Sequence, residues 1–128
     1  MNKITAQIAQ CMIGFEAANG VVKSRFLFPD DFVGFQEHFP DKKVLPGVCQ
    51  IQSALAAVAK ARQREVVLKE ITLAKYFSPV GPGEEIQCVC SGVAQAGEFT
   101  IKAAITKGTV KVSELKLRVA LETGKGKI

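Results

Sequence analysis

Hydrophobic and polar positions divide the chain into two strands, one helix and four further strands. In the first part, apolar runs at Cys11–Ala18 and Val21–Phe28 flank the pair Asn19-Gly20. An Asn-Gly pair favours a tight two-residue turn, because both residues tolerate a positive φ. The pattern therefore predicts a hairpin. Pro29-Asp30 ends its second strand, because proline lacks the N–H that a sheet requires.

A helical spacing begins at Pro46-Gly47. Apolar residues then recur three and four positions apart, at Val48, Ile51, Ala54, Leu55, Val58 and Ala59. This spacing places them on one side of a helix. The segment stays apolar over most of its circumference as far as Lys60, whereas a surface helix normally has a polar half. We therefore expect other structure to wrap around it. A short helical turn is also expected at Asp31–Gln36.

The remainder of the chain has the pattern of strands separated by turn residues. The four predicted strands are Val66–Phe77, Glu85–Ala94, Glu98–Thr106 and Thr109–Leu121. They are rich in β-branched residues, which favour a pleated sheet. Apolar residues alternate with polar ones, first at Ile101, Ala103 and Ile105 and then over Val110, Val112 and Glu114. This alternation predicts an antiparallel sheet with one buried face. The order of elements predicts a single α+β domain over residues 1–128, in which one helix lies along a curved sheet.

Length and composition agree with one soluble domain. The chain has 128 residues, of which 48% are hydrophobic and 23% charged, and these proportions exclude a disordered or low-complexity protein. No apolar run approaches the roughly 20 residues that a membrane span needs. The start, Met1–Gln7, is too polar for the apolar segment of a signal peptide. We therefore expect a cytoplasmic protein that does not associate with membranes.

The charge balance narrows the choice of partners. The net charge is +5, but the basic residues are scattered, there is no Trp, and only one Tyr is present. Nucleic acid is not expected as a partner, because no basic and aromatic residues alternate to stack bases. An acidic protein or an anionic substrate fits the charge equally well. The four cysteines, Cys11, Cys49, Cys88 and Cys90, lack the C-x2-C spacing of a zinc site, so we predict buried free thiols and no metal or other cofactor.

Two positions carry candidate chemistry. His38 is the only histidine, and histidine is the side chain whose unperturbed pKa lies near neutrality. Gly47 stands at the start of the apolar helix, where first-turn N–H groups lack intrahelical acceptors. Because glycine has no Cβ, a polarised carbonyl such as that of a thioester can approach its N–H closely.

Around these two positions the sequence resembles a known family. His38-Phe39-Pro40 followed by Val44–Val48 is similar to the H-F-P-G-x-P-V-x-P-G-V signature of bacterial 3-hydroxyacyl-(acyl-carrier-protein) dehydratases. Ala74–Glu84 is similar to the A-x-F-x-x-P-V-x-P-G-D segment of the same family. The resemblance covers about Arg25–Leu121. It implies a hotdog fold, in which a curved antiparallel sheet wraps a long apolar central helix. It also implies a homodimer or higher homo-oligomer, with sheets joined edge to edge and sites at the interface.

The resemblance also implies roles for individual residues. It makes His38 the base that removes the α-proton of a 3-hydroxyacyl thioester, and it places the Gly47 N–H on the thioester carbonyl. Phe39, Pro46 and Val48 would contact the substrate, with Val48 lining an acyl tunnel. The implied partner is an acyl carrier protein that bears the acyl group on phosphopantetheine.

The sequence departs from the family at a catalytic position. The family has Glu or Asp fourteen residues after the histidine, and this chain has Gln52 there. An amide can orient water or a hydroxyl, but it cannot transfer a proton at neutral pH. Asp41 and Lys43 also replace the Gly and the second Pro of the signature. No other residue is an evident substitute for the missing acid.

Three functions therefore remain open. The first is a dehydratase, or related hydratase, that works through His38 while Gln52 holds a water, in fatty acid synthesis or in specialised acyl or polyene synthesis. The second is a thioesterase of the same fold. The third is a non-catalytic module that binds acylated carrier protein, with Lys42, Lys43, Arg62 and Lys75 as candidate contacts for its acidic surface.

Overall fold

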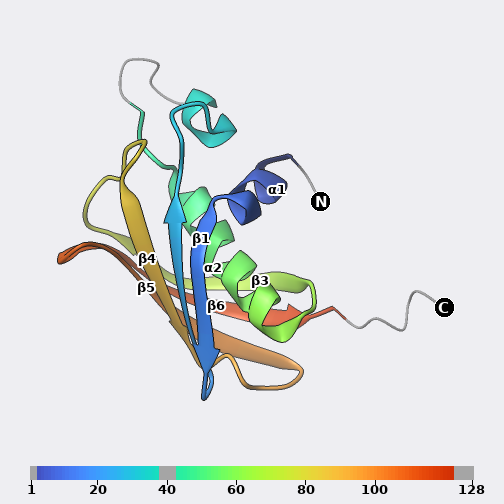
Figure 1. The fold of residues 1–128 in the computed structure, drawn as a ribbon. Coiled ribbons are helices and arrows are strands. Elements are labelled where there is room, and N and C mark those ends of the chain that lie inside the picture. The colour runs from blue at the N-terminus through green and yellow to red at the C-terminus, as the bar shows by residue number, and fades with distance from the viewer. Residues whose placement is uncertain (1–2, 38–42, 123–128) are drawn as a thin grey trace.

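The computed structural model describes residues 3–37 and 43–122, which form two α-helices, one 3-10 helix and six strands (Figure 1). The elements in chain order are α1 (Lys3–Gln10), β1 (Met12–Ala18), β2 (Val21–Leu27), η1 (Val33–Glu37), α2 (Gly47–Arg62), β3 (Val66–Tyr76), β4 (Glu85–Ser91), β5 (Glu98–Lys107) and β6 (Val110–Leu121). The predicted succession of two strands, one main helix and four strands is therefore confirmed.

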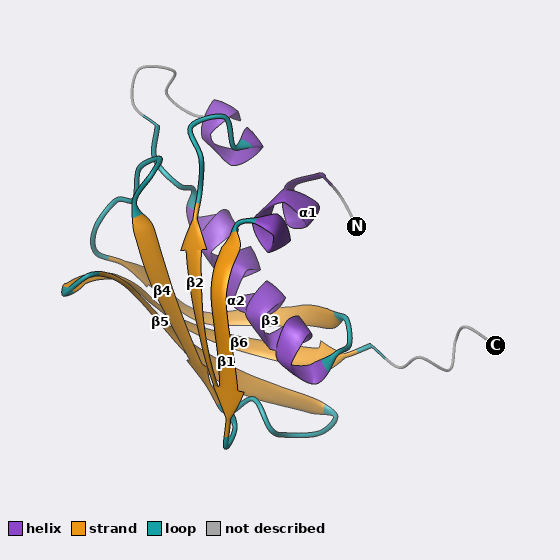
Figure 2. Ribbon diagram, in the orientation of Figure 1, coloured by secondary structure: helices purple, strands orange, loops and turns teal. Residues whose placement is uncertain are grey.

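All six strands belong to one antiparallel sheet in the order β1-β2-β4-β5-β6-β3. The sheet is strongly curved, and α2 lies against its inner side (Figure 2). In this view β1, β2 and β4 are steeply inclined, whereas β3 and β6 lie nearly horizontal behind α2 (Figure 2). This arrangement is the α+β, hotdog-like architecture that was expected. The helix α2 has 16 residues, eight of them buried.

The hydrophobic core fills the space between α2 and the sheet. Ile101, Ala103 and Ile105 alternate inward along β5, as their spacing predicts. At one end of the core a series of buried rings runs from β2 to η1, and the centroids of neighbouring rings lie 4.8–6.0 Å apart; the rings belong to Phe26, Phe28, Phe32 and Phe35. This cluster anchors η1, the element that directly precedes His38.

The first hairpin forms as the Asn-Gly pair predicts. Asn19 and Gly20 have φ angles of 55° and 77°, and β1 and β2 pair on either side of them. The predicted helical turn near Asp31–Gln36 is the 3-10 helix η1. None of the helices in the described part of the chain is long and apolar enough to cross a membrane.

Two features differ from the predictions. The segment read only as a polar start forms α1, which packs on α2 through the fully buried Ile8. Val110 was expected to continue the inward alternation, but its side chain is 45% exposed. Val112 is buried as predicted, but the register between β5 and β6 shifts at Ile105/Thr106, and beyond this point Ser113 and Leu115 are buried in place of Glu114. A one-residue shift exchanges the two faces of a strand, so the simple alternation fails there.

Candidate functional site

A groove of about 440 Å³ lies at the N-terminal end of α2. One wall comes from the segment that leads into the helix and from its first turn, and the other from the end of β3 and the loop after it. The lining residues are Val44, Leu45, Pro46, Gly47 and Gln50 on the first wall, and Tyr76, Phe77, Ser78 and Pro79 on the second. The structure thus brings together the two segments that carry the family resemblance, although they lie some thirty positions apart in the sequence.

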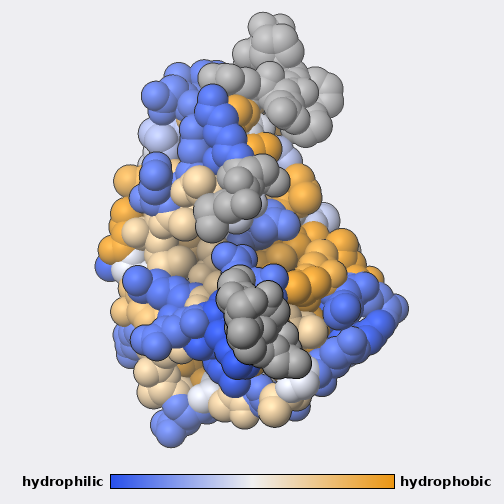
Figure 3. All heavy atoms as spheres, turned by 90° about the vertical axis from the view of Figure 1, so that its right-hand side faces the viewer, coloured by the Kyte–Doolittle hydropathy of each residue, from blue (hydrophilic) through white to orange (hydrophobic). Residues whose placement is uncertain are grey.

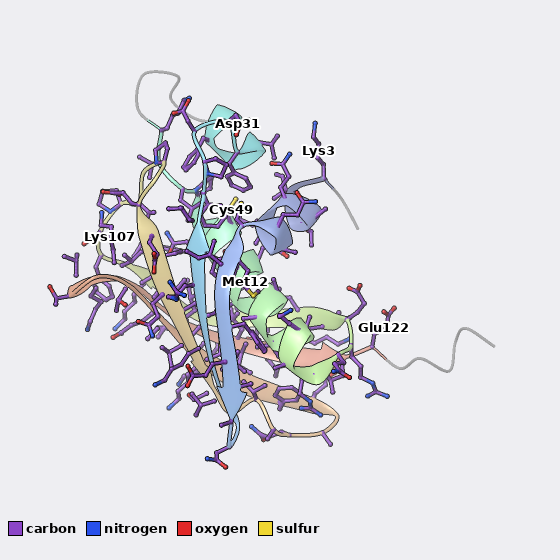
Figure 4. The ribbon with its side chains drawn as sticks, viewed as in Figure 1. Lys3, Met12, Asp31, Cys49, Lys107 and Glu122 are labelled. Carbon is purple, nitrogen blue, oxygen red and sulfur yellow. The ribbon has the colours of Figure 1, made fainter. Side chains whose placement is uncertain are left out.

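The two walls are tied to each other and to the sheet. Leu45 donates its backbone N–H to the carbonyl of Val80 at 2.7 Å. Lys107, labelled in Figure 4, donates to the carbonyl of Pro79 at 2.9 Å and to the carboxylate of Glu84 at 3.0 Å. The Gly81 N–H and then the Lys107 ammonium lower the pKa of the Glu84 carboxyl. This carboxylate therefore stays charged and holds the 79–84 loop in place.

Gly47 occupies the first position of α2, directly after Pro46. Pro46 has an extended backbone with φ −63° and ψ 150°, and its side chain cannot cap the helix. Proline suits this place because its fixed φ fits a helix start and its missing N–H would be an orphan there. The N–H groups of the first turn lack intrahelical acceptors and form the positive end of the helix dipole. Pro46 and Gly47, both predicted site residues, therefore line the groove.

The ring of Tyr76 lies directly over Gly47. A Cβ placed on Gly47 would be 2.6 Å from both Cζ and Oη of Tyr76. No side chain larger than hydrogen fits there unless the ring moves. Partial burial raises the pKa of the Tyr76 hydroxyl, so at neutral pH it keeps its proton and can donate a hydrogen bond. Tyr76 stands where the family pattern has Phe, and it is not among the site residues predicted from the sequence.

Gln50 is another groove residue that was not predicted as a site residue. Its side chain is 3% exposed, and its Oε1 is buried without a hydrogen-bond partner. Leaving a buried acceptor unpaired typically costs about 1–3 kcal/mol. The sequence did carry a signal, since a glutamine in the first turn of an otherwise apolar helix is a polar group on a buried face.

Gln52 and Val48 lie on the other side of α2. Two residues apart on a helix means about 200° of rotation, so Gln52 faces away from Gln50. Gln52 is half-buried, Val48 is 61% exposed, and neither lines the groove of the single chain. Figure 3 looks at the molecule from the right-hand side of Figure 1, and much of the surface on that side is hydrophobic. In the single chain, the predicted site residues Val48 and Gln52 therefore lie outside the groove that Pro46 and Gly47 line.

The other predicted site residues, His38 and Phe39, lie outside the described residues, as does Lys42. Of the basic residues considered for an acidic partner, Lys43 pairs with Asp30 at 2.8 Å. Arg62 donates to the carbonyls of Val93 and Gln95, both at 2.6 Å, at the opposite end of α2 from the groove. Arg62 therefore holds the loop between β4 and β5 and does not border the candidate site.

The four cysteines are not joined by disulfide bonds. Cys49, Cys88 and Cys90 are buried, as predicted, while Cys11 is partly exposed. Burial, and next the charge of Asp31, raises the pKa of Cys11, so this thiol is not an activated nucleophile. Within residues 3–37 and 43–122, no three potential metal ligands come together.

The fold and the groove define a hotdog-like protein with a candidate ligand site at the start of its central helix. The chain belongs to the ApeI-like family of dehydratases, whose family model, described as ApeI dehydratase, matches residues 15–115. This match includes both walls of the groove. No curated protein matches the sequence significantly.

Solved structures share the fold at low sequence identity. The dehydratase heterocomplex ApeI:P from Xenorhabdus doucetiae has a TM-score of 0.69 and 19% identity, covering 85% of this chain and 96% of that chain. The conserved protein PA5202 from Pseudomonas aeruginosa has a TM-score of 0.66 and 15% identity, with 95% of each chain covered. The PaaI protein of Escherichia coli, from the phenylacetic acid degradation operon, has a TM-score of 0.66 and 11% identity, covering 91% of this chain and 88% of that one.

Proposed function

We propose that this protein is a dehydratase that removes water from 3-hydroxyacyl thioesters carried by an acyl carrier protein, and so forms trans-2-enoyl thioesters. The groove is the observation that carries the proposal. It joins the Pro46-Gly47 helix start to the end of β3 in a mainly apolar hollow. Membership of the ApeI-like dehydratase family supports the same reaction class. A role in fatty acid synthesis or in the synthesis of specialised acyl or polyene chains is part of this proposal.

His38 and Gly47 have complementary tasks in the proposed reaction. His38 accepts the proton from C2, and the electron pair left behind spreads onto the thioester carbonyl. The Gly47 N–H, at the positive end of α2, stabilises the charge that develops on the carbonyl oxygen. The C3–O bond then breaks, the protonated His38 returns its proton to the departing hydroxyl, which leaves as water, and the C2=C3 double bond forms. Phe39, Pro46 and Val48 contact the acyl chain in this proposal.

The proposed assembly is a homodimer joined at β3. This strand is at one end of the sheet order, has eleven residues, and exposes Val67 and Ile71 by 41% and 48%. An exposed apolar edge strand readily pairs with another chain. A second copy placed there would also approach the face of α2 that carries Val48 and Gln52. Light scattering is expected to give a solution mass of two chains, or a multiple of two, and a monomer at all concentrations would contradict this assembly.

Gln52 is proposed to hold a water near the reacting group, at the position where the 3-hydroxyacyl-(acyl-carrier-protein) dehydratases that the sequence resembles have a carboxylate. Gln52→Leu is expected to lower the dehydration rate about tenfold, which is the effect of one lost hydrogen bond. Gln52→Glu is expected to keep the wild-type rate or exceed it, because a carboxyl group can both orient water and transfer a proton. Initial rates with a 3-hydroxyacyl thioester measure both effects. An unchanged rate in Gln52→Leu would remove this residue from the reaction.

The decisive test of the function offers 3-hydroxyacyl and trans-2-enoyl thioesters on both coenzyme A and carrier protein. Interconversion of the two acyl groups, followed by mass spectrometry as loss or gain of water, is the expected result. Release of free thiol without dehydration would instead show a thioesterase. Binding of acylated carrier without turnover, weakened by added salt, would show a non-catalytic module that recognises an acidic partner.

A further inference from the structure

The buried amide of Gln50 has no role in the reaction proposed above. Among the residues that the structure describes, only two buried side-chain polar atoms have no hydrogen-bond partner, Gln50 Oε1 and Ser113 Oγ. Gln50 lines the groove, and Ser113 does not. Buried polar groups in folded proteins are nearly always paired, so an orphaned acceptor in a ligand groove indicates a missing ligand donor.

The helix geometry places Gln50 at a specific distance from Gly47. Residues three positions apart lie on the same side of a helix, and they are separated by about 4.5 Å along its axis. Both residues line the same groove. In a 3-hydroxyacyl thioester, the hydroxyl is attached two carbons beyond the carbonyl, so the two oxygens lie within a few ångströms of each other. A ligand whose carbonyl meets the Gly47 N–H can therefore place its hydroxyl within reach of Gln50.

We propose that the Gln50 amide turns toward the groove when an acyl thioester binds, and that Oε1, buried in the free protein, then accepts a hydrogen bond from the 3-hydroxyl group. This inference rests on the proposed function, because it takes the thioester carbonyl to lie at Gly47. Gln50 is then a specificity residue that distinguishes hydroxylated from saturated acyl groups. A site built to bind a hydroxyl rejects an analogue without it, because the buried acceptor is again left unpaired.

The surroundings of Gln50 favour a hydroxyl over a charged ligand group. Its neighbours in the groove include the apolar Leu45 and Pro46, and no Lys, Arg, Asp or Glu is among the lining residues that the structure describes. A neutral amide offers a neutral acceptor in this setting, and it matches a neutral O–H donor. Charged groups lose far more on burial than a hydroxyl does. The pantetheine amides lie on the opposite side of the thioester sulfur and therefore farther from Gln50.

The experiment measures the dissociation constants of two pantetheine thioesters of equal chain length, one with a 3-hydroxyl group and one saturated. A His38→Ala background prevents turnover. With Gln50 present, the hydroxylated ligand is expected to bind about tenfold more tightly, as one net hydrogen bond allows. Gln50→Met, an apolar change of similar length, is expected to equalise the two affinities by weakening only the hydroxylated ligand. The saturated ligand is expected to change less than about twofold.

Ser113→Ala is the matched control, because it removes the other buried orphaned atom from a position outside the groove. It is expected to leave the preference for the hydroxylated ligand unchanged. Without ligand, Gln50→Met is expected to melt at or above the temperature of the parent protein, since it removes a buried unpaired acceptor. A purely structural glutamine would instead lose stability on substitution.

Several outcomes would overturn the inference. Equal affinities for the two ligands with Gln50 in place would do so without any Gln50 variant, even if Gln50→Met failed to fold. A preference that survives in Gln50→Met would also reject this role while leaving the proposed function intact. If neither thioester binds the groove, the proposed function fails and the inference fails with it.

Discussion

Replacing His38 by alanine is expected to lower the dehydration rate by about 10²–10⁴-fold, the usual contribution of a positioned general base. It is the only histidine in the chain, and the thiols of Cys11 and Cys88 have pKa values raised by their surroundings. These thiols therefore do not supply an alternative base at neutral pH. The loss is expected in kcat, because His38 acts on the α-proton and not on the acyl chain. Steady-state kinetics with a 3-hydroxyacyl thioester separate kcat from KM.

The neighbouring Glu37 provides the control for His38. Glu37→Gln keeps the size of the side chain and removes a carboxylate that adjoins His38 in sequence. It is expected to leave kcat within a few-fold of the wild-type value. A large loss in Glu37→Gln together with a small loss in His38→Ala would assign the base to the carboxylate and would refute the proposed mechanism.

Gly47→Ala is expected to lower the rate by about 10²–10³-fold, the cost of losing one donor to a developing oxyanion. The added methyl group would lie 2.6 Å from the ring and hydroxyl of Tyr76, so the ring must move. The methyl then occupies the approach to the first-turn N–H groups. Folding stability is expected to stay within about 1 kcal/mol, because alanine suits a helix at least as well as glycine. Rates and thermal melting measure the two effects separately.

Two variants separate the possible causes of that loss. Gly81→Ala is the control, because its new Cβ would meet its nearest atoms at 3.6–3.7 Å, an ordinary contact. The double variant Gly47→Ala/Tyr76→Ala removes the crowding but leaves the methyl group over the N–H. The double variant is expected to remain slow. Full recovery of the rate would show that the position of Tyr76, and not access to the N–H, controls the reaction.

Several elements follow directly from local patterns. Asn19 and Gly20 adopt the positive φ angles that a two-residue turn requires, so they place the first hairpin. The apolar spacing predicted the helix that begins at Gly47, and the alternation over Ile101–Ile105 predicted the inward face of β5. In each case the backbone geometry depends on neighbouring residues, and the sequence contains that information.

Other elements depended on contacts between distant segments. Ile4 and Ile8 lie four positions apart in α1, but this single pair does not show that the short helix packs on α2. The shifted pairing of β5 with β6 buries Ser113 and Leu115 in place of Glu114. Register is a property of two strands together, and a pattern within one of them does not reveal it.

The features of the candidate site also fall into two groups, those that the local sequence determines and those that depend on tertiary contacts. The chain by itself determined that Pro46 and Gly47 start the central helix, and it placed His38 shortly before them. Only the tertiary structure decided that Gln50, and not Gln52, lines the groove and that Tyr76 lies over Gly47. Helix spacing states which residues share a side, but the sheet that packs against the helix decides which side is enclosed.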